Sequence, residues 1–144
     1  MENRNRDAIV SRRGVLCGVA ALTLGFVPEA AIAATGVTQN KSGKIVVDLA
    51  LNKALAKIGG AITLPLQDGS SIAVVRTALG SKGLVALNLS CTHQGVPVSK
   101  VGTAWECPAH GSKFALGGSV INGPAQMPLR KYPLTATATK VTIG

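Results

Sequence analysis

Aromatic side chains are scarce in this chain of 144 residues, at 3% of the total. Hydrophobic residues nevertheless make up 47% of it, so the core must be built from Val, Leu, Ile and Ala, which suit the strands of a compact sheet. Acidic residues are also few, six against 15 Lys and Arg, so the formal net charge is +9 and a partner surface is expected to be acidic. No basic run is interleaved with aromatics, which argues against nucleic acid as the partner.

The apolar run at residues 14–27 is too short for a membrane helix, since about 20 residues are needed to cross a bilayer. It follows a polar start with four arginines and precedes Ala31-Ile32-Ala33, a small-residue cleavage pattern. Residues 1–33 therefore read as a secretory signal cleaved after Ala33, with an uncleaved membrane tether as the alternative. Ser11-Arg12-Arg13-Gly14-Val15-Leu16 resembles the twin-arginine export motif, which carries folded proteins and predicts a periplasmic location.

The remainder is expected to form a polar, flexible lead at residues 34–42 and one domain at residues 43–144. Short apolar stretches separated by glycine and polar turns indicate an all-β sandwich or small barrel, with Asp68-Gly69 in a hairpin turn and one or two helical turns at residues 52–58. The strands are expected at residues 44–49, 61–66, 71–76, 83–88, 101–106, 129–134 and 135–143.

Cysteine and histidine are rarer still, at three and two residues, and they occur in pairs. Cys91-Thr92-His93 is one pair, and Cys107-Pro108-Ala109-His110 is the other. If Cys17 leaves with the signal, the two pairs contain every remaining cysteine and histidine. Thiolate and imidazole are suitable donors for zinc or iron–sulfur clusters and unsuitable for calcium or magnesium.

Three interpretations of these pairs compete. A disulfide would suit an oxidising compartment, but it leaves both histidines unexplained. A structural zinc site usually begins with a Cys-x-x-Cys knuckle and groups its histidines, which this alternating pattern does not do. The third interpretation is a [2Fe–2S] cluster in which two histidines replace two cysteines on one iron.

Two segments, Cys91-Thr92-His93-Gln94-Gly95 and Cys107-Pro108-Ala109-His110-Gly111-Ser112, resemble the cluster-binding loops of the Rieske family. Gly123-Pro124-Ala125 is similar to the proline-containing third loop that covers the cluster in that family. The resemblance implies a Rieske-like antiparallel β-sandwich or small barrel with a cluster-binding subdomain. It also implies that Cys91 and Cys107 bind the inner iron, and that His93 and His110 bind the outer one.

The same resemblance bears on the reduction potential. With two thiolates and two neutral imidazoles, the oxidised cluster is formally neutral and accepts an electron more readily than an all-cysteine cluster. The reduction potential of such centres is roughly −150 to +300 mV. Ser112 stands where high-potential members place a hydroxyl that donates to a cluster sulfide. Phe114 stands where they have a tyrosine, and Val96 and Ala109 stand where they have a clamping disulfide. We therefore expect an intermediate potential.

The sequence contains no nucleophile–base pair and no nucleotide loop, which favours an electron-transfer protein over an enzyme. The expected partners are redox proteins of an exported respiratory-type oxidoreductase, either a quinol-oxidising cytochrome bc-like complex or a molybdenum enzyme such as arsenite oxidase. A free periplasmic carrier that serves a c-type cytochrome is the alternative. An oxygenase ferredoxin is less favoured, because such ferredoxins work in the cytoplasm. Trp105 and Tyr132 are expected to be structural.

Overall fold

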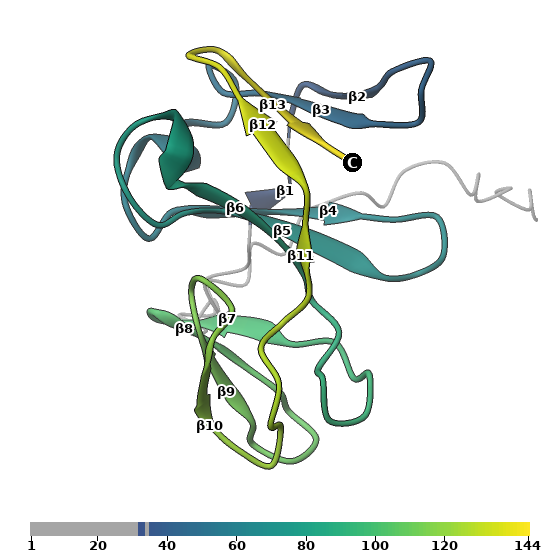
Figure 1. Ribbon diagram of the computed structural model, residues 1–144, viewed down its shortest axis with the longest axis vertical. Coiled ribbons are helices and arrows are strands. Elements are labelled where there is room, and N and C mark those ends of the chain that lie inside the picture. Colours follow the sequence, from purple (N-terminus) through teal and green to yellow (C-terminus); the bar gives the residue numbers. More distant parts are fainter. Residues whose placement is uncertain (1–31, 34) are drawn as a thin grey trace, which may run out of the picture.

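The computed structural model describes residues 32–33 and 35–144 and shows an all-β fold of three sheets (Figure 1). The expected all-β class is therefore confirmed. Of the predicted signal segment, only the two-residue strand β1 is described, and the apolar run, the twin arginines and Cys17 lie outside the described residues. In the part of the chain that is described, no helix has the length and apolar character needed to cross a membrane.

The first sheet has the strand order β1-β4-β5-β6-β11. Its neighbouring strands pair antiparallel, except that β1 runs parallel to β4. The Asp68-Gly69 turn joins β4 to β5, as predicted, and Gly69 has the positive φ of 81° that this turn requires. The strands are β1 (Ile32–Ala33), β4 (Ala61–Pro65), β5 (Ser71–Arg76), β6 (Leu84–Asn88) and β11 (Lys131–Tyr132).

The second sheet has the order β12-β13-β3-β2 and is antiparallel throughout. The single strand expected at residues 135–143 is wrong: it is a hairpin, because the Thr137 hydroxyl accepts hydrogen bonds from the Lys140 and Thr139 amides and turns the chain. Within the segment expected to be a flexible lead, β2 pairs with β3. The strands are β2 (Val37–Gln39), β3 (Ile45–Asp48), β12 (Leu134–Ala136) and β13 (Lys140–Ile143).

The third sheet is an antiparallel meander of order β10-β9-β8-β7. The strand expected at residues 101–106 exists only at residues 104–106, because Gly102 adopts a positive φ of 56° and turns the chain between two strands. The strands at residues 113–115 and 120–122, which follow Cys107, were not expected from the sequence. The strands are β7 (Ser99–Val101), β8 (Ala104–Glu106), β9 (Lys113–Ala115) and β10 (Val120–Asn122).

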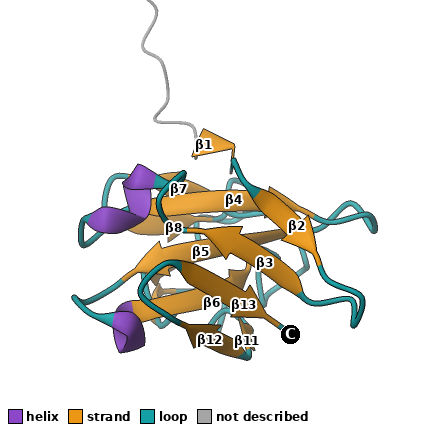
Figure 2. Ribbon diagram, turned by 90° about the horizontal axis from the view of Figure 1, so that it is seen from above, coloured by secondary structure: helices purple, strands orange, loops and turns teal. Residues whose placement is uncertain are grey.

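Two short 3-10 helices, η1 (Lys53–Ala56) and η2 (Ser81–Gly83), precede β4 and β6. The first corresponds to the helical turn expected at residues 52–58. Figures 1 and 2 show both helices at the same end of the first sheet. They are the helical content of the described chain.

The hydrophobic core is divided in two. One cluster lies between the first and second sheets, in what we call the base (residues 35–88 and 130–144), and includes Val47, Val74 and Val141. The other joins the first sheet to the third, in what we call the tip (residues 89–129). Trp105 is 1% exposed in this second cluster, and its indole nitrogen donates to the Leu116 carbonyl over 3.2 Å. Its predicted structural role is confirmed.

Candidate metal centre

Both Cys-His pairs lie on loops of the tip, one after β6 and the other between β8 and β9 (Figure 1). Cys91 and Cys107 are each 3% exposed and belong to the tip core, and both are free thiols. His93 and His110 are exposed, with their rings edge to face and their centroids 5.0 Å apart. The two loops therefore bring together two buried sulfurs and two outward-facing imidazoles.

The two loops have the same backbone frame. In the first, the amide of Cys91 donates to the carbonyl of Val96, five residues on, and the amide of Gly95 donates back to the Cys91 carbonyl. In the second, the amide of Cys107 donates to the Ser112 carbonyl in the same way, and the amide of Gly111 donates back to Cys107. The glycines have positive φ values of 75° and 72°, which close both loops.

Ser112 is fully buried beside the thiols, and its hydroxyl oxygen accepts the amide proton of Ala125 over 3.1 Å. Burial raises the pKa of Cys91, but hydrogen bonds from the His93 amide and from the Cys107 and Ser112 side chains more than offset this effect. The pKa of Cys91 consequently lies below that of an ordinary thiol. A lowered pKa favours the thiolate, which is the form that binds metal.

The third loop is connected to both cysteine loops. The amide of Ala125 reaches Ser112 in the second loop, and the Thr92 hydroxyl in the first loop donates to the Met127 carbonyl over 2.5 Å. Gly123 and Pro124, joined by a cis peptide bond, are exposed on this loop. Sequence reasoning identified the loop but missed Thr92, whose hydroxyl is an ordinary surface group until the fold places Met127 opposite it.

The remaining predicted residues around the site are apolar. Phe114 is fully buried on β9 in the tip core, and Val96 packs against the same core from the first loop. Ala109 is exposed in the second loop. None of these three side chains can supply a hydroxyl or a thiol at its position.

The donor set fits a cluster that divides its ligands between two irons. Two sulfurs lie on the buried side and two imidazoles on the exposed side, and both residue types are iron–sulfur ligands. Within residues 32–33 and 35–144, no group of three or more His, Cys, Asp or Glu side chains could hold one metal ion. A cluster with two ligands on each iron does not require such a group.

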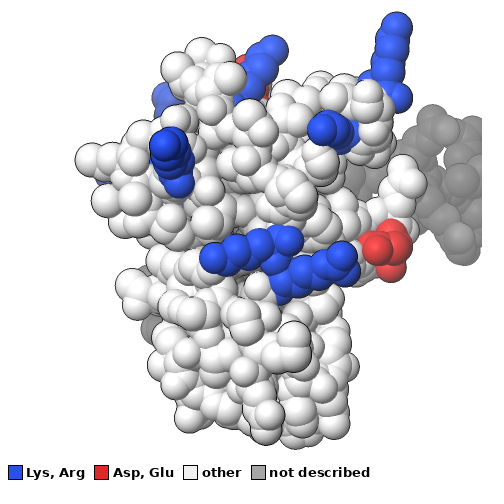
Figure 3. Space-filling view, viewed as in Figure 1, with Lys and Arg blue, Asp and Glu red and all other residues white. Residues whose placement is uncertain are grey.

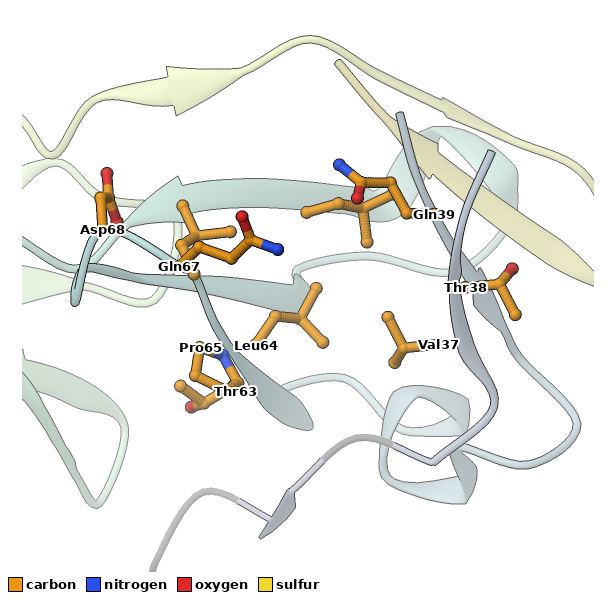
Figure 4. Close-up of a pocket in the computed structure, with 10 residues that line it drawn as sticks. Val37, Thr38, Gln39, Thr63, Leu64, Pro65, Gln67 and Asp68 are labelled. Atoms are coloured by element: carbon orange, nitrogen blue, oxygen red, sulfur yellow. The ribbon is translucent and has the colours of Figure 1, made fainter. Parts of the chain in front are cut away.

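A separate pocket of about 670 Å³ lies in the base, between β2, β3 and the β4–β5 turn (Figure 4). Its lining combines apolar side chains, such as Val37 and Leu64, with polar ones, such as Gln39 and Gln67. It contains none of the four Cys and His residues. The pocket is thus independent of the metal centre.

Charge is distributed unevenly between tip and base. On the face seen in Figure 3, which is viewed as in Figure 1, Lys and Arg lie over the upper part and in a band across the middle. The lower end of this face has no charged side chains. The loops at residues 89–99, 107–112 and 114–129 contain no Asp, Glu, Lys or Arg. The two loops that contain the exposed histidines therefore have no charged side chain of their own.

Comparison with known proteins identifies the family. The model of the Rieske [2Fe-2S] domain matches residues 56–133, and the chain belongs to this family. The cytochrome b6-f complex iron-sulfur subunit of Chlorobaculum tepidum is 30% identical over 106 residues, covering 72% of this chain and 57% of that protein. The mitochondrial cytochrome b-c1 complex subunit Rieske of Schizosaccharomyces pombe is 39% identical over 57 residues, covering 38% of this chain and 25% of that protein.

Solved structures confirm the fold. A chain of a hyperthermophilic respiratory complex III superposes with a TM-score of 0.53 at 23% identity, covering 67% of this chain and 71% of that one. Naphthalene 1,2-dioxygenase superposes with the same TM-score at 16% identity, covering 64% of this chain and 24% of that one. This is a Rieske protein, and the cofactor that its family domain implies is one [2Fe–2S] cluster used for electron transfer.

Proposed function

We propose that Cys91 and Cys107 hold the buried iron of the cluster and that His93 and His110 hold the exposed one. The observation that carries this assignment is the opposite burial of the two residue types on loops with the same backbone frame. When bound, the cluster supplies a one-electron redox centre. The two histidine rings lie at the surface, where an electron has the shortest path to a partner.

The chain's own groups set the properties of this centre. The His93 amide and the Cys107 and Ser112 side chains lower the pKa of Cys91, and groups that stabilise negative charge on sulfur also raise the potential. Phe114 offers no hydroxyl. We therefore propose an intermediate midpoint, below that of members with both hydroxyls and above that of members with neither.

In the cell, we propose that the chain transfers electrons on the periplasmic side of the membrane, as a subunit or partner of a quinol-oxidising cytochrome bc-like complex. The names of the relatives in Chlorobaculum tepidum and Schizosaccharomyces pombe support this partner. The periplasmic location rests on the twin-arginine motif at residues 11–16. The net charge of +9 predicts an acidic partner surface, but the loops that contain His93 and His110 have no charged side chain, so we propose that the part of the partner that meets the histidines is largely uncharged.

The test is a redox titration of the purified, full-length holoprotein, followed by electron paramagnetic resonance, with iron and acid-labile sulfide measured per chain. We expect two irons and two sulfides per chain and a midpoint in the middle of the Rieske range. A midpoint at the top of that range would refute the role given to Phe114. A colourless, iron-free protein would refute the site itself.

The partner requires a separate experiment. An affinity-tagged chain expressed in its own cells should copurify from solubilised membranes with a b-type cytochrome and quinol-oxidising activity. Recovery with a molybdenum enzyme, or as a free protein that reduces a c-type cytochrome, would replace the proposed partner and leave the metal centre unaffected.

A further inference from the structure

Three large aliphatic side chains are exposed at the end of the base where η1 and η2 lie. Leu51 is 58% exposed, Ile58 60% and Leu79 75%, and they account for three of the seven large hydrophobic residues exposed in the described chain. Leu51 and Ile58 flank η1, and Leu79 precedes η2. Single exposed aliphatics are ordinary, so the significance of these three depends on what joins and surrounds them.

Arg76 joins the two segments. Its backbone carbonyl accepts the amide proton of Gly59, beside Ile58, over 2.8 Å. Its side chain donates to the Leu55 carbonyl on η1 over 2.8 Å and also to the Gly80 carbonyl, beside Leu79. Arg76 thus connects the segments around η1 and η2, and we call the surface formed by residues 51–59 and 78–83 the η face.

The η face is basic. Lys53, Lys57 and Lys82 are exposed on or next to the two helices. Of the three acidic residues in the described chain, only Asp48 lies near, at the end of β3, where its carboxylate accepts the Ala50 amide over 2.8 Å. Asp68 lies in the β4–β5 turn.

Glu106 is the third acidic residue. It forms an ion pair with Lys113 in the tip, with 2.9 Å between nitrogen and oxygen. The positive charge of the η face is therefore opposed by Asp48 alone among the described acidic residues.

The N-terminal part of the described chain passes beside this surface, at Thr35. Thr35 exchanges two hydrogen bonds with Asn52, the residue before η1: its amide donates to the Asn52 side chain over 3.2 Å, and its carbonyl accepts from that side chain over 2.6 Å. The apolar run at residues 14–27 precedes this point in the sequence.

We propose that the η face binds the surface of an anionic membrane. Lysines are attracted to anionic headgroups, and aliphatic side chains that project from turns can bury themselves among the acyl chains. An acidic protein would match the lysines but gives no reason for aliphatics projecting from two separate turns. Figure 1 places the η helices and the Cys-His loops in different parts of the molecule, so membrane contact leaves the histidines accessible. The proposal does not depend on the choice of redox partner.

The test measures how the full-length holoprotein partitions onto vesicles of phosphatidylcholine alone, or of equal parts phosphatidylcholine and phosphatidylglycerol. The variant Lys53→Gln/Lys57→Gln/Lys82→Gln should bind the anionic vesicles at least about tenfold more weakly than the parent, since each lysine near a membrane contributes to attraction. The matched control Lys41→Gln/Lys44→Gln/Lys131→Gln removes the same charge elsewhere and should bind almost like the parent. Leu79→Ser should weaken binding several-fold, whereas Met127→Ser, at another exposed aliphatic, should not.

Hydrogen exchange on the same vesicles supplies a local measurement that binding through residues 1–31 cannot imitate. Amides at residues 51–59 and 78–83 should become protected on anionic vesicles, and those at residues 121–127 should not. Equal losses in the two triple variants, no preference for anionic vesicles, or protection at residues 121–127 instead would each overturn the proposal. With no preference for anionic vesicles, an acidic protein would be the better occupant of the η face, and protection at residues 121–127 would place the membrane contact at the tip instead.

Discussion

The two cysteine loops share a backbone frame, although only the cysteine and the glycine are common to their six residues. Each has a cysteine whose amide bonds five residues ahead and a glycine with positive φ four residues on. The histidine, however, comes two residues after Cys91 and three after Cys107, and the residue closing the frame is Val96 in one loop and Ser112 in the other. The shared frame thus sets the positions of the two sulfurs, whereas the residues that differ set the positions of the histidine rings and place a buried hydroxyl, that of Ser112, only in the second loop.

The largest effect should come from removing the sulfurs, which the two loops present equivalently. Cys91→Ser and Cys107→Ser should each reduce bound iron nearly to zero, because a hydroxyl is a poor ligand for iron–sulfur clusters. Visible absorption and iron per chain measure this. Cys17→Ser is the control and should retain the full spectrum. If either loop variant kept a normal cluster, the equivalence of the loops would fail.

The next largest effect should come from the buried hydroxyl of Ser112, which has no buried counterpart in the first loop. Ser112→Ala should lower the midpoint by roughly 60–130 mV, since a hydrogen bond to a charged group is worth about 1.5–3 kcal/mol. It should also lower the free energy of unfolding by about 1–3 kcal/mol, because the Ala125 amide loses its buried partner.

Redox titration and denaturant unfolding measure these two effects of Ser112→Ala. Ser119→Ala, at an exposed serine, should change neither quantity. An unchanged midpoint in Ser112→Ala would show that its hydroxyl acts only on the third loop.

The glycines test whether the two frames are equally demanding. Gly95→Ala and Gly111→Ala meet no atom within 4 Å, so each should cost only the left-handed conformation, about 1–2 kcal/mol, and the two costs should agree. Denaturant unfolding of the holoprotein measures both. Gly43→Ala, also at positive φ and with open space around it, should cost a similar amount and leave the cluster spectrum unchanged. Markedly unequal losses in the loops would contradict a shared frame.

The smallest effect should come from the hydrogen bond that joins the first loop to the third. Thr92→Val keeps the shape of the side chain but removes the hydroxyl that donates to Met127. Because this bond is exposed, the expected loss of stability is about 0.5 kcal/mol. Faster hydrogen exchange of amides at residues 123–127 would reveal the loosened loop, and unchanged exchange would show that Ser112 alone holds it.

Much of this molecule could be predicted from local patterns. The Asp68-Gly69 hairpin follows from turn chemistry, and the expected strand at residues 83–88 matches β6 because it is a continuous apolar run. The two Cys-His pairs were conspicuous because they exhaust the histidine of the chain. Pairing of residue types therefore gave the candidate ligands without any knowledge of how the loops fold.

What could not be predicted depends on contacts distant in sequence or on turns without the usual residues. The turn at Thr137 has neither glycine nor proline, so strand-like alternation runs through it, and only hydroxyl-to-amide hydrogen bonds turn the chain. The bond from Thr92 to Met127 spans 35 residues, and no local pattern encodes it. The exposed aliphatics beside η1 and η2 look like core residues in the sequence.

The membership of Cys91 and Cys107 in the tip core has a consequence for how the protein matures. The two cysteines that would bind iron pack in the same cluster as Trp105, whereas the cluster between the first and second sheets contains neither cysteine. Binding of iron is therefore expected to stabilise the core of the tip and to have little effect on the cluster between the first and second sheets. A chain without metal should lose its fixed packing first at the tip, around the histidines, while the base stays folded.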